Sequence, residues 1–404
     1  MTRCFLLLAS VLFCCNVFSQ ELRGRVLAAD SSGPIAGASI FLSNTSIGTV
    51  AISNGEFSIA RLPEGRFDLV VSSVGFETQV ISLQTSGIQP GFIVYLKPKA
   101  KELEAVIVRS YEKDGWKRWG VFFIETLIGT SAAAKKCNLK NTAAIKFVHN
   151  RKLKLLRAYA SEALVIENRE LGYLLTYQLE DFEYDFNKGQ LIYEGYPLFK
   201  DMKPRSERQV KRWLQNRNES YDGSMMHFMR ALFRNRVMQA GFEMRKLKKI
   251  PGPEAQRIKP LYDDLLIKKD STGNFPEQSD RDSMAYYSAV MANPGTKDFL
   301  INELLPGDSV EYAEDSVSAG FFFEDYLHIT YTKKKESTEF PGLNHSRKPD
   351  WITSRIHLPA KRPLTVLANG SYYNGKDLLT SGYWAWSEKL ADMLPLDFWP
   401  VIEK

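Results

Sequence analysis

An alternating pattern of apolar and polar residues between positions 50 and 76 most constrains the fold of this chain. Phe57 and Ile59 fall on one side of an extended segment, and Glu56 and Ser58 fall on the other. A period of two is typical of a β-strand with one buried face. The pattern recurs at residues 66–71, so we expect an antiparallel β-module near the N-terminus.

The dipeptide Asn54-Gly55 separates two of these alternating segments. Both residue types tolerate the positive φ of a type I′ turn, and Asn-Gly is the strongest short-range signal of a β-hairpin. Turn formers at residues 30–34 and 63–65 and at Gly75 separate further candidate strands at residues 22–29, 39–42, 78–83 and 92–96. About seven short strands with frequent turns indicate a two-layer β-sandwich rather than βαβ units.

Residues 24–79, GRVLAADSSGPIAGASIFLSNTSIGTVAISNGEFSIARLPEGRFDLVVSSVGFETQ, resemble the carboxypeptidase regulatory-like domain. This domain is a transthyretin-like β-sandwich found in secreted proteins of Bacteroidota. The resemblance covers residues 21–98. It depends on the Gly-Xaa-Val start, the Pro-Xaa-Ala-Gly-Ala turn, the Gly-Thr-Val strand, the Asn-Gly-Xaa-Phe hairpin and the Val-Gly-Phe end. It implies an accessory domain that has no catalytic residues of its own.

The histidines argue against a zinc carboxypeptidase, which would need a His-Xaa-Xaa-Glu pair and a second, distant histidine. None of the five histidines has a glutamate at that offset: His149, His227, His328, His345 and His357. We therefore predict no metal site and no cofactor.

Residues 1–19 are predicted to be a signal peptide, because Arg3 precedes an apolar stretch at residues 5–18 and cleavage fits after Ser19. In an alternative interpretation Cys14 or Cys15 is acylated, although a bulky phenylalanine precedes Cys14. Once the signal is removed, Cys137 is the remaining cysteine, so no intramolecular disulfide is expected. We expect an exported protein that is periplasmic or associated with the outer membrane.

The length of 404 residues favours two or three domains, and 44% hydrophobic with 25% charged residues is typical of globular proteins. The predicted parts are the signal (1–19), the sandwich (20–98), a linker (99–118) and a larger α+β domain (119–404). After the signal, no apolar run reaches about 18 residues, so no transmembrane segment is predicted there. Peripheral membrane association stays open. The formal charge of +6 does not by itself imply nucleic-acid binding.

The charged segment KPKAKELE at residues 97–104 leads into a strand-like segment at residues 105–108. This order resembles the start of TonB-dependent outer-membrane receptors. Their barrel of about 22 strands does not fit into the remaining chain beside its polar helices. A receptor function is therefore not expected.

The region after the linker mixes both kinds of secondary structure. Helical or loop-helical segments are predicted at 116–128, 131–137, 206–217 and 224–240. Strands are predicted at 157–166, 171–186, 321–332 and 363–386, with turns at 168–170, Asn369-Gly370 and Asn374-Gly375. The aromatic-rich residues 382–399 are expected to dock on the core. This region is similar to the second part of uncharacterised Bacteroidota proteins. The similarity therefore implies an architecture and no particular reaction.

The predicted helix at 224–240 has Ser224 as a natural N-cap and Gly241 as a natural stop. Its helical spacing puts five side chains on one stripe: Met226, Met229, Phe233, Val237 and Ala240. We interpret the stripe as core packing, with a soft peptide-binding groove as the alternative.

Residues 203–249 contain thirteen lysines and arginines and only four acids. His227, Arg230 and Arg234 are expected on the face opposite the methionine stripe, where they form a candidate site for an anionic glycan or a lipopolysaccharide phosphate. The favoured interpretation is that these cations are solvated or pair internally with the acids at residues 180–185 and 303–325, and the anion site is the alternative. Nucleic acid is not expected, because no groove-reading motif is present.

No catalytic residue is predicted. Ser131 follows Gly129-Thr130 without the closing glycine of a nucleophile elbow. Asp222, Ser224 and His227 surround a helix start, where capping is the simpler role. Neighbouring lysines at 135 and 136 could lower the pKa of Cys137, but a buried structural cysteine is the favoured interpretation.

These features favour a non-catalytic exported envelope protein that acts as a binding or assembly module, with the sandwich as its accessory domain. The expected partner is an envelope protein or an anionic glycan. The alternative is a hydrolase that acts on envelope peptides or glycans through carboxylates that the sequence cannot pair.

Overall fold

We describe a computed structural model of the chain, covering residues 21–63, 65–85, 88, 91–99, 111–268, 277–315, 317–341, 348–373 and 375–401. The predicted signal peptide, the strand-like residues 105–108, His345 and Asn374 lie outside these ranges. The chain divides into two compact units, one of residues 1–227, 367–371 and 386–404 and one of residues 228–366 and 372–385. The division at residue 227 lies within the predicted domain 119–404, whose boundaries remain a prediction.

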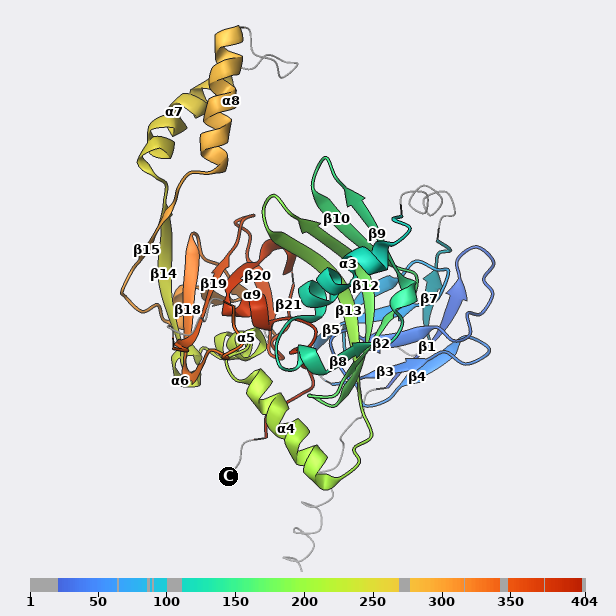
Figure 1. The fold of residues 1–404 in the computed structure, drawn as a ribbon. Helices are drawn as coiled ribbons and strands as arrows, with labels where there is room; N and C mark the ends of the chain where they lie inside the picture. Colours follow the sequence, from blue (N-terminus) through green and yellow to red (C-terminus); the bar gives the residue numbers. More distant parts are fainter. Residues whose placement is uncertain are drawn as a thin grey trace, which may run out of the picture. The chain divides into compact units, whose positions relative to one another are not determined.

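The N-terminal part of the first unit is the predicted β-sandwich (Figure 1). One layer has the order β4-β1-β7, with β1 and β7 parallel. The other has the order β3-β2-β5-β6. The seven strands are β1 (Leu22–Ala28), β2 (Ser39–Leu42), β3 (Gly48–Val50), β4 (Glu56–Ile59), β5 (Arg66–Ser72), β6 (Gln79–Gln84) and β7 (Phe92–Leu96). The fold class predicted for this region is confirmed.

The turn at Asn54-Gly55 differs from the prediction. Gly55 has a φ of 80°, but Asn54 is not among the residues with positive φ, so the turn is not type I′. The Gly55 N–H donates to the Ile52 carbonyl at 2.9 Å. The turn also leads from β3 in one layer to β4 in the other, so the hairpin interpretation is wrong.

Burial in the sandwich follows the alternation in the sequence. Phe57 and Ile59 are buried, whereas Glu56 and Ser58 between them are exposed. The facing layer contributes Leu69 and Val71, among other side chains, to the same core. Burial of this apolar surface holds the two layers together.

The second part of the first unit is a six-stranded sheet with the order β8-β11-β12-β10-β9 and β13 paired to β12. Its strands are β8 (Cys137–Leu139), β9 (Ile145–Asn150), β10 (Leu155–Ala160), β11 (Leu164–Asn168), β12 (Tyr173–Asp185) and β13 (Gln190–Asp201). The strand predicted at 157–166 is two strands that pair with opposite ends of β12, along the edge that β13 does not occupy. The long strand and the turn that precedes it are confirmed.

Helix α3 (Gly115–Phe123) continues into a π-helical turn (Ile124–Ile128), as predicted for 116–128. Residues 131–137 contribute one 3-10 turn (Ala134–Lys136), and a second 3-10 turn is Thr142–Ala144. The sheet core also includes residues of the C-terminal segment, namely Leu390, Ala391, Leu394 and Phe398. The docking predicted for that segment is confirmed.

The loop after β2 joins the sandwich to the six-stranded sheet within the first unit. The Asn44 N–H donates to the Pro197 carbonyl at 2.8 Å, and the Phe199 N–H donates to the Thr45 carbonyl at 2.9 Å. Thr45 is fully buried. Its hydroxyl donates to the Leu42 carbonyl and accepts from the Ile47 N–H. The sandwich is therefore fixed to β13 by main-chain hydrogen bonds.

Helix α4 (Glu207–Tyr221) begins at the Ser206 cap, and its predicted range is extended by four residues. The helix predicted at 224–240 is two helices, α5 (Met225–Phe233) and α6 (Val237–Ala240). The chain breaks at Asn235, which has a φ of 49°. Ser224 and Gly241 cap the two ends as predicted. Of the predicted stripe, Met229 and Val237 are buried, and the other three members are partly buried, namely Met226, Phe233 and Ala240.

The second unit contains two sheets, with orders β15-β14-β18-β19-β22 and β16-β17-β20-β21. The first comprises β14 (Phe242–Ile250), β15 (Lys297–Leu300), β18 (Tyr326–Lys335), β19 (Trp351–His357) and β22 (Leu379–Gly382). The second comprises β16 (Glu311–Ala313), β17 (Ser318–Phe321), β20 (Leu364–Leu367) and β21 (Tyr372–Tyr373). Two 3-10 turns are Gly307–Ser309 and Gly375–Asp377. The end of the strand region predicted at 363–386 is instead helix α9 (Tyr383–Ser387).

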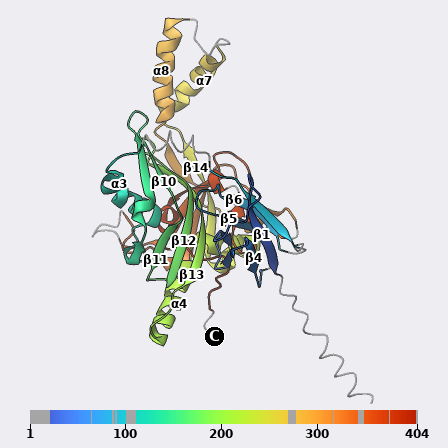
Figure 2. The ribbon, with the colours of Figure 1, turned by 90° about the vertical axis from the view of Figure 1, so that its right-hand side faces the viewer.

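Helices α7 (Pro253–Ile267) and α8 (Gln278–Ala292) form a helical arm between β14 and β15. Figure 1 shows the arm extending from the ends of these two strands, and Figure 2 shows it beyond the end of β14. Helix α8 has no buried residue, and α7 buries only Ala255, Ile258 and Leu265. No described helix combines the length and apolar character that a bilayer span requires.

Candidate functional site: a groove on the sandwich

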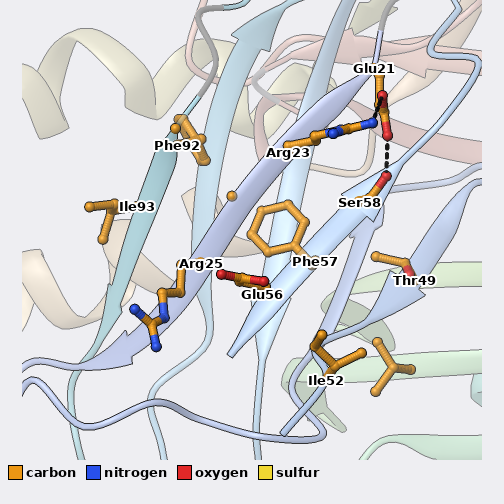
Figure 3. Close-up of a pocket in the computed structure, with 13 residues that line it drawn as sticks. Glu21, Arg23, Arg25, Thr49, Ile52, Glu56, Phe57, Ser58, Phe92 and Ile93 are labelled. Atoms are coloured by element: carbon orange, nitrogen blue, oxygen red, sulfur yellow. Dashed lines mark hydrogen bonds and ion pairs between the residues drawn. The ribbon is translucent and has the colours of Figure 1, made fainter. Parts of the chain in front are cut away.

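Residues of β1, β3, β4 and β7 and of the segments next to these strands line a groove with a volume of about 690 Å³ (Figure 3). It is built entirely by sandwich residues. The groove is lined by Glu21, Arg23, Gly24, Arg25, Thr49, Val50, Ile52, Glu56, Phe57, Ser58, Gly91, Phe92 and Ile93.

Strand alternation explains which side chains reach the groove. On β1, Leu22 and Val26 are buried, so Arg23 and Arg25 point to the outside. Gly24 lies between them and allows close packing from two neighbouring strands. A Cβ at this position would lie 2.2 Å from the Phe92 carbonyl oxygen and 2.7 Å from the Phe57 ring.

At one end of the groove the charged side chains pair with each other. Arg23 pairs with Glu21 at 2.8 Å, and the Ser58 hydroxyl donates to the same carboxylate at 2.5 Å. Figure 3 shows both contacts as dashed lines. The hydrogen bonds from Arg23 and Ser58 hold the pKa of Glu21 below its ordinary value. Because this carboxylate is exposed, the pair orients the side chains more than it stabilises the fold.

The other end of the groove holds two charges that are open to a ligand. Arg25 lies opposite Glu56 in the β1–β4 register. The Arg25 Nε donates to the Asn54 carbonyl at 2.7 Å, which orients the guanidinium. Within the part of the chain that the structure describes, neither Arg25 nor Glu56 forms an ion pair. Both groups can therefore contact a bound molecule.

Apolar side chains border these charges. Val50 is 58% exposed, Ile52 is 59% exposed and Ile93 is 52% exposed. Exposed aliphatic side chains around a concave surface are a common feature of binding sites, because a ligand removes them from water.

The three residues predicted to bind an anion lie elsewhere, on or after α5. The His227 ring stacks on Tyr221 at 4.7 Å, and its Nδ1 accepts from the Gly223 N–H at 3.3 Å. Arg230 is only 1% exposed, so its placement on a solvent-facing surface is wrong. Arg234 is exposed and donates to the Arg230 carbonyl at 3.1 Å. These residues do not form the predicted three-residue grip.

Some cations of the basic region pair internally, as one interpretation held, but with unexpected partners. Arg217 contacts Asp201 at 2.7 Å, and its guanidinium lies 3.7 Å from the centre of the Tyr173 ring. Arg245 pairs with Glu243 at 2.8 Å. Neither acid belongs to the segments 180–185 or 303–325.

The residues considered for nucleophilic chemistry have structural roles. Burial and the nearby charge of Asp392 raise the pKa of Cys137 to about 12, so the thiol is not activated by its neighbouring lysines. The Ser131 hydroxyl donates to Asp392 at 2.7 Å and accepts from the Ala134 N–H. Ser224 caps α5 by accepting from the His227 N–H at 3.1 Å.

Glu388 is a chemically distinctive residue that the sequence did not reveal. Its carboxylate accepts from the Met225 N–H at the start of α5, at 2.9 Å. Burial raises the pKa of Glu388 to about 7, although that hydrogen bond opposes the change. Some of the residue remains exposed, but its carboxyl group is removed from water. The signal for this site is tertiary, because residues 225 and 388 meet only in the folded chain.

Within the described ranges, no cluster of three or more His, Cys, Asp or Glu side chains could bind a metal ion. No curated protein matches the sequence. Among solved structures, one similar chain is a Bacteroides fragilis NCTC 9343 protein of unknown function, described as a candidate membrane-associated protein. It shares 8% identity, with 86% of this chain and 92% of that chain covered, at a TM-score of 0.15. A likeness at this TM-score supports no statement about fold or role.

The family comparison is more informative. Residues 22–108 match the CarboxypepD_reg-like domain, and the match contains all seven strands of the sandwich and most residues that line the groove. The chain therefore carries an N-terminal carboxypeptidase regulatory-like domain, as its strand and turn pattern predicts.

Proposed function

We propose that this protein is a non-catalytic, exported protein of the cell envelope and that it acts as a binding or assembly module. The groove on the sandwich is the observation that carries this proposal. It combines two open charges, Arg25 and Glu56, with exposed aliphatic side chains. A surface of this kind suits a polar partner with some apolar character.

The proposed compartment is the periplasm or the periphery of the outer membrane. It rests on the signal-peptide pattern of residues 1–19. The main-chain hydrogen bonds between the sandwich and β13 support an assembly role, because they would hold a partner bound at the groove close to the larger sheet.

Site-specific photocrosslinking in the cells that produce the protein tests this function. A benzophenone amino acid replaces Ile93 in the groove, and in a matched control it replaces Val74, which is 77% exposed but does not line the groove. We expect a discrete crosslinked partner from an envelope fraction at position 93 and none at position 74. Absence of a product at 93, or equal products at both positions, would contradict the proposal.

Glu388 favours one alternative function, a hydrolase that acts on envelope peptides or glycans. A carboxyl group with a pKa of about 7 is the kind of group that serves as a general acid at neutral pH. Asp392, four residues away, raises that pKa further through its charge. Turnover of peptidoglycan or envelope peptides by the purified protein, lost in both Glu388→Gln and Asp392→Asn, would establish the hydrolase and exclude the binding module.

A further inference from the structure

We propose that the groove binds an extended polypeptide segment, which adds as a strand to the open edge of β4. This inference rests on the function proposed above and specifies its partner class.

The edge of β4 is open at Ser58, whereas on the same edge the Glu56 carbonyl accepts from the Ile52 N–H at 2.9 Å and the Glu56 N–H donates to the Asn54 side chain at 3.0 Å. Among the described strands, β4 pairs with β1 alone and ends its layer. The Val26 N–H donates to the Gly55 carbonyl. Backbone groups of successive strand residues point to opposite sides, so Phe57 and Ile59 bond to β1 while the N–H and C=O of Ser58 point away from it. An unpaired strand edge of this kind is a template for another chain.

A second open edge borders the same groove. Strand β3 pairs with β2 alone and ends the other layer. The Leu42 N–H donates to the Ile47 carbonyl and the Ala51 N–H donates to the Ala38 carbonyl. By the same alternation, the backbone groups of Val50 point away from β2. Val50 and Ser58 both line the groove, so an extended segment there meets backbone donors and acceptors from both layers.

The side chains specify the composition of the segment. Val50 and Ile52 lie beside the edge and are both more than half exposed, so they suit one aliphatic side chain of the ligand. The guanidinium of Arg25 is oriented by its bond to Asn54 and has no acidic partner among the described residues. The guanidinium therefore suits an acidic side chain of the ligand. This side chain would lie two positions from the aliphatic one, on the same face of the added strand.

A glycan fits the same surface less well. Sugar rings commonly stack on exposed aromatic faces, whereas Phe57 is only 5% exposed and its ring lies beneath the position of a Gly24 Cβ. The N–H and C=O groups at an open strand edge are best satisfied by the main chain of another extended segment.

The test begins with random twelve-residue peptides displayed on phage and selected on the full chain. A selected peptide is then synthesised with a fluorophore, and its Kd is measured by anisotropy. We expect selected peptides to alternate aliphatic and polar residues, with an acidic residue on one face. Methylation of the alternate peptide nitrogens that face β4 should abolish binding, because their N–H groups bond to that edge, whereas methylation of the other set, which faces β3, should weaken binding less.

Matched variants locate the site. Ile52→Glu places a charge where the aliphatic side chain binds, and Val74→Glu places the same charge on an exposed position outside the groove. We expect Ile52→Glu to weaken binding by about tenfold or more, which corresponds to about 1.4 kcal/mol, and Val74→Glu to leave it unchanged. Arg25→Gln should weaken the binding of acidic peptides and leave the binding of their neutral analogues unchanged. Circular dichroism confirms that each variant is folded.

The outcomes separate this inference from the proposed function. A partner that crosslinks at position 93 but is a glycan, together with failure to select any groove-specific peptide, overturns strand addition and leaves the binding module standing. Peptides that bind equally to Ile52→Glu and to the unmodified chain also overturn it. If neither a crosslinked partner nor a peptide is found, the inference and the proposed function both fall.

Discussion

Glu388 carries a carboxyl group that is buried against the start of α5, and its titration is predicted to control stability. Its pKa in the folded chain, about 7, lies above the ordinary value of 4.5. The folded state therefore holds this proton more tightly than the unfolded state, and the free energy of unfolding falls as the pH rises from about 4.5 to about 7. At higher pH the cost of the buried charge is at most about 3 kcal/mol.

We expect Glu388→Gln to be more stable than the unmodified chain at pH 8, by about 1 to 3 kcal/mol, and nearly equal to it at pH 4.5. Glutamine keeps an acceptor for the Met225 N–H and removes the charge. Urea unfolding at both pH values measures the difference, with Glu125→Gln as a control at an exposed position of the π-helical turn. If Glu125→Gln raised the free energy of unfolding at pH 8 by the same amount, the effect could not be assigned to the titration of Glu388.

The groove illustrates which residues the sequence can and cannot assign to a site. Alternation alone predicts that Phe57 is buried and Glu56 exposed. It does not predict that Arg25 faces Glu56, or that Ile93 lies near both, because β1 pairs with strands that begin about 30 and about 70 residues later in the chain. The predicted exposure of Arg230 was wrong for a related reason. Helical spacing alone could not show that Arg230 lies in the interior of the protein.

At the scale of elements, the loop between β2 and β3 determines whether the sandwich is an independent module. Thr45 satisfies two backbone groups of this loop with its hydroxyl, while its own carbonyl accepts from Phe199 of β13. We expect Thr45→Val to lower the free energy of unfolding by about 1 to 3 kcal/mol, because the Leu42 carbonyl and the Ile47 N–H would lose their buried partner.

Thermal and urea unfolding measure this loss. Thr49→Val is the matched control, because Thr49 lies on β3 and its hydroxyl makes no hydrogen bond within the described residues. We also expect the Thr45→Val chain to show greater hydrogen exchange at the Phe199 amide than the control. Equal stability of the two variants would show that the loop does not fix the sandwich to β13.

Element prediction succeeded where one local signal governed the structure. Most sandwich strands follow from period-two spacing and turn formers, and α4 follows from the helical spacing predicted for 206–217. The helix predicted at 224–240 failed because apolar spacing continues through Asn235, although the chain there adopts a left-handed conformation. The Asn54-Gly55 turn failed because two strands that follow each other in sequence belong to different layers. In both cases the local sequence signal does not determine the observed backbone.

At the scale of the whole chain, the helical arm is a described part that is weakly connected to a core. Every residue of β15 is exposed, and α8 buries nothing. Ile267 at the end of α7 is 82% exposed. Isolated helices of this length are marginally stable in water, so the arm has a low local free energy of unfolding compared with β18 or β12.

The register at the base of the arm has a consequence for how the chain can be shortened. Ile250 and Lys297 face each other as the last paired residues of β14 and β15, so the 46 intervening positions, 251–296, occupy the place of a simple β-turn. Substituting Asn-Gly for them should leave the oligomeric state unchanged and give a near-ultraviolet circular dichroism spectrum that keeps its tryptophan bands, because residues 251–296 contain no tryptophan. Aggregation or loss of that spectrum would show that the excised piece is integral. Success would mark this site as a permissive insertion point, at which a lineage can gain or lose an appendage without redesigning the sheet beneath it.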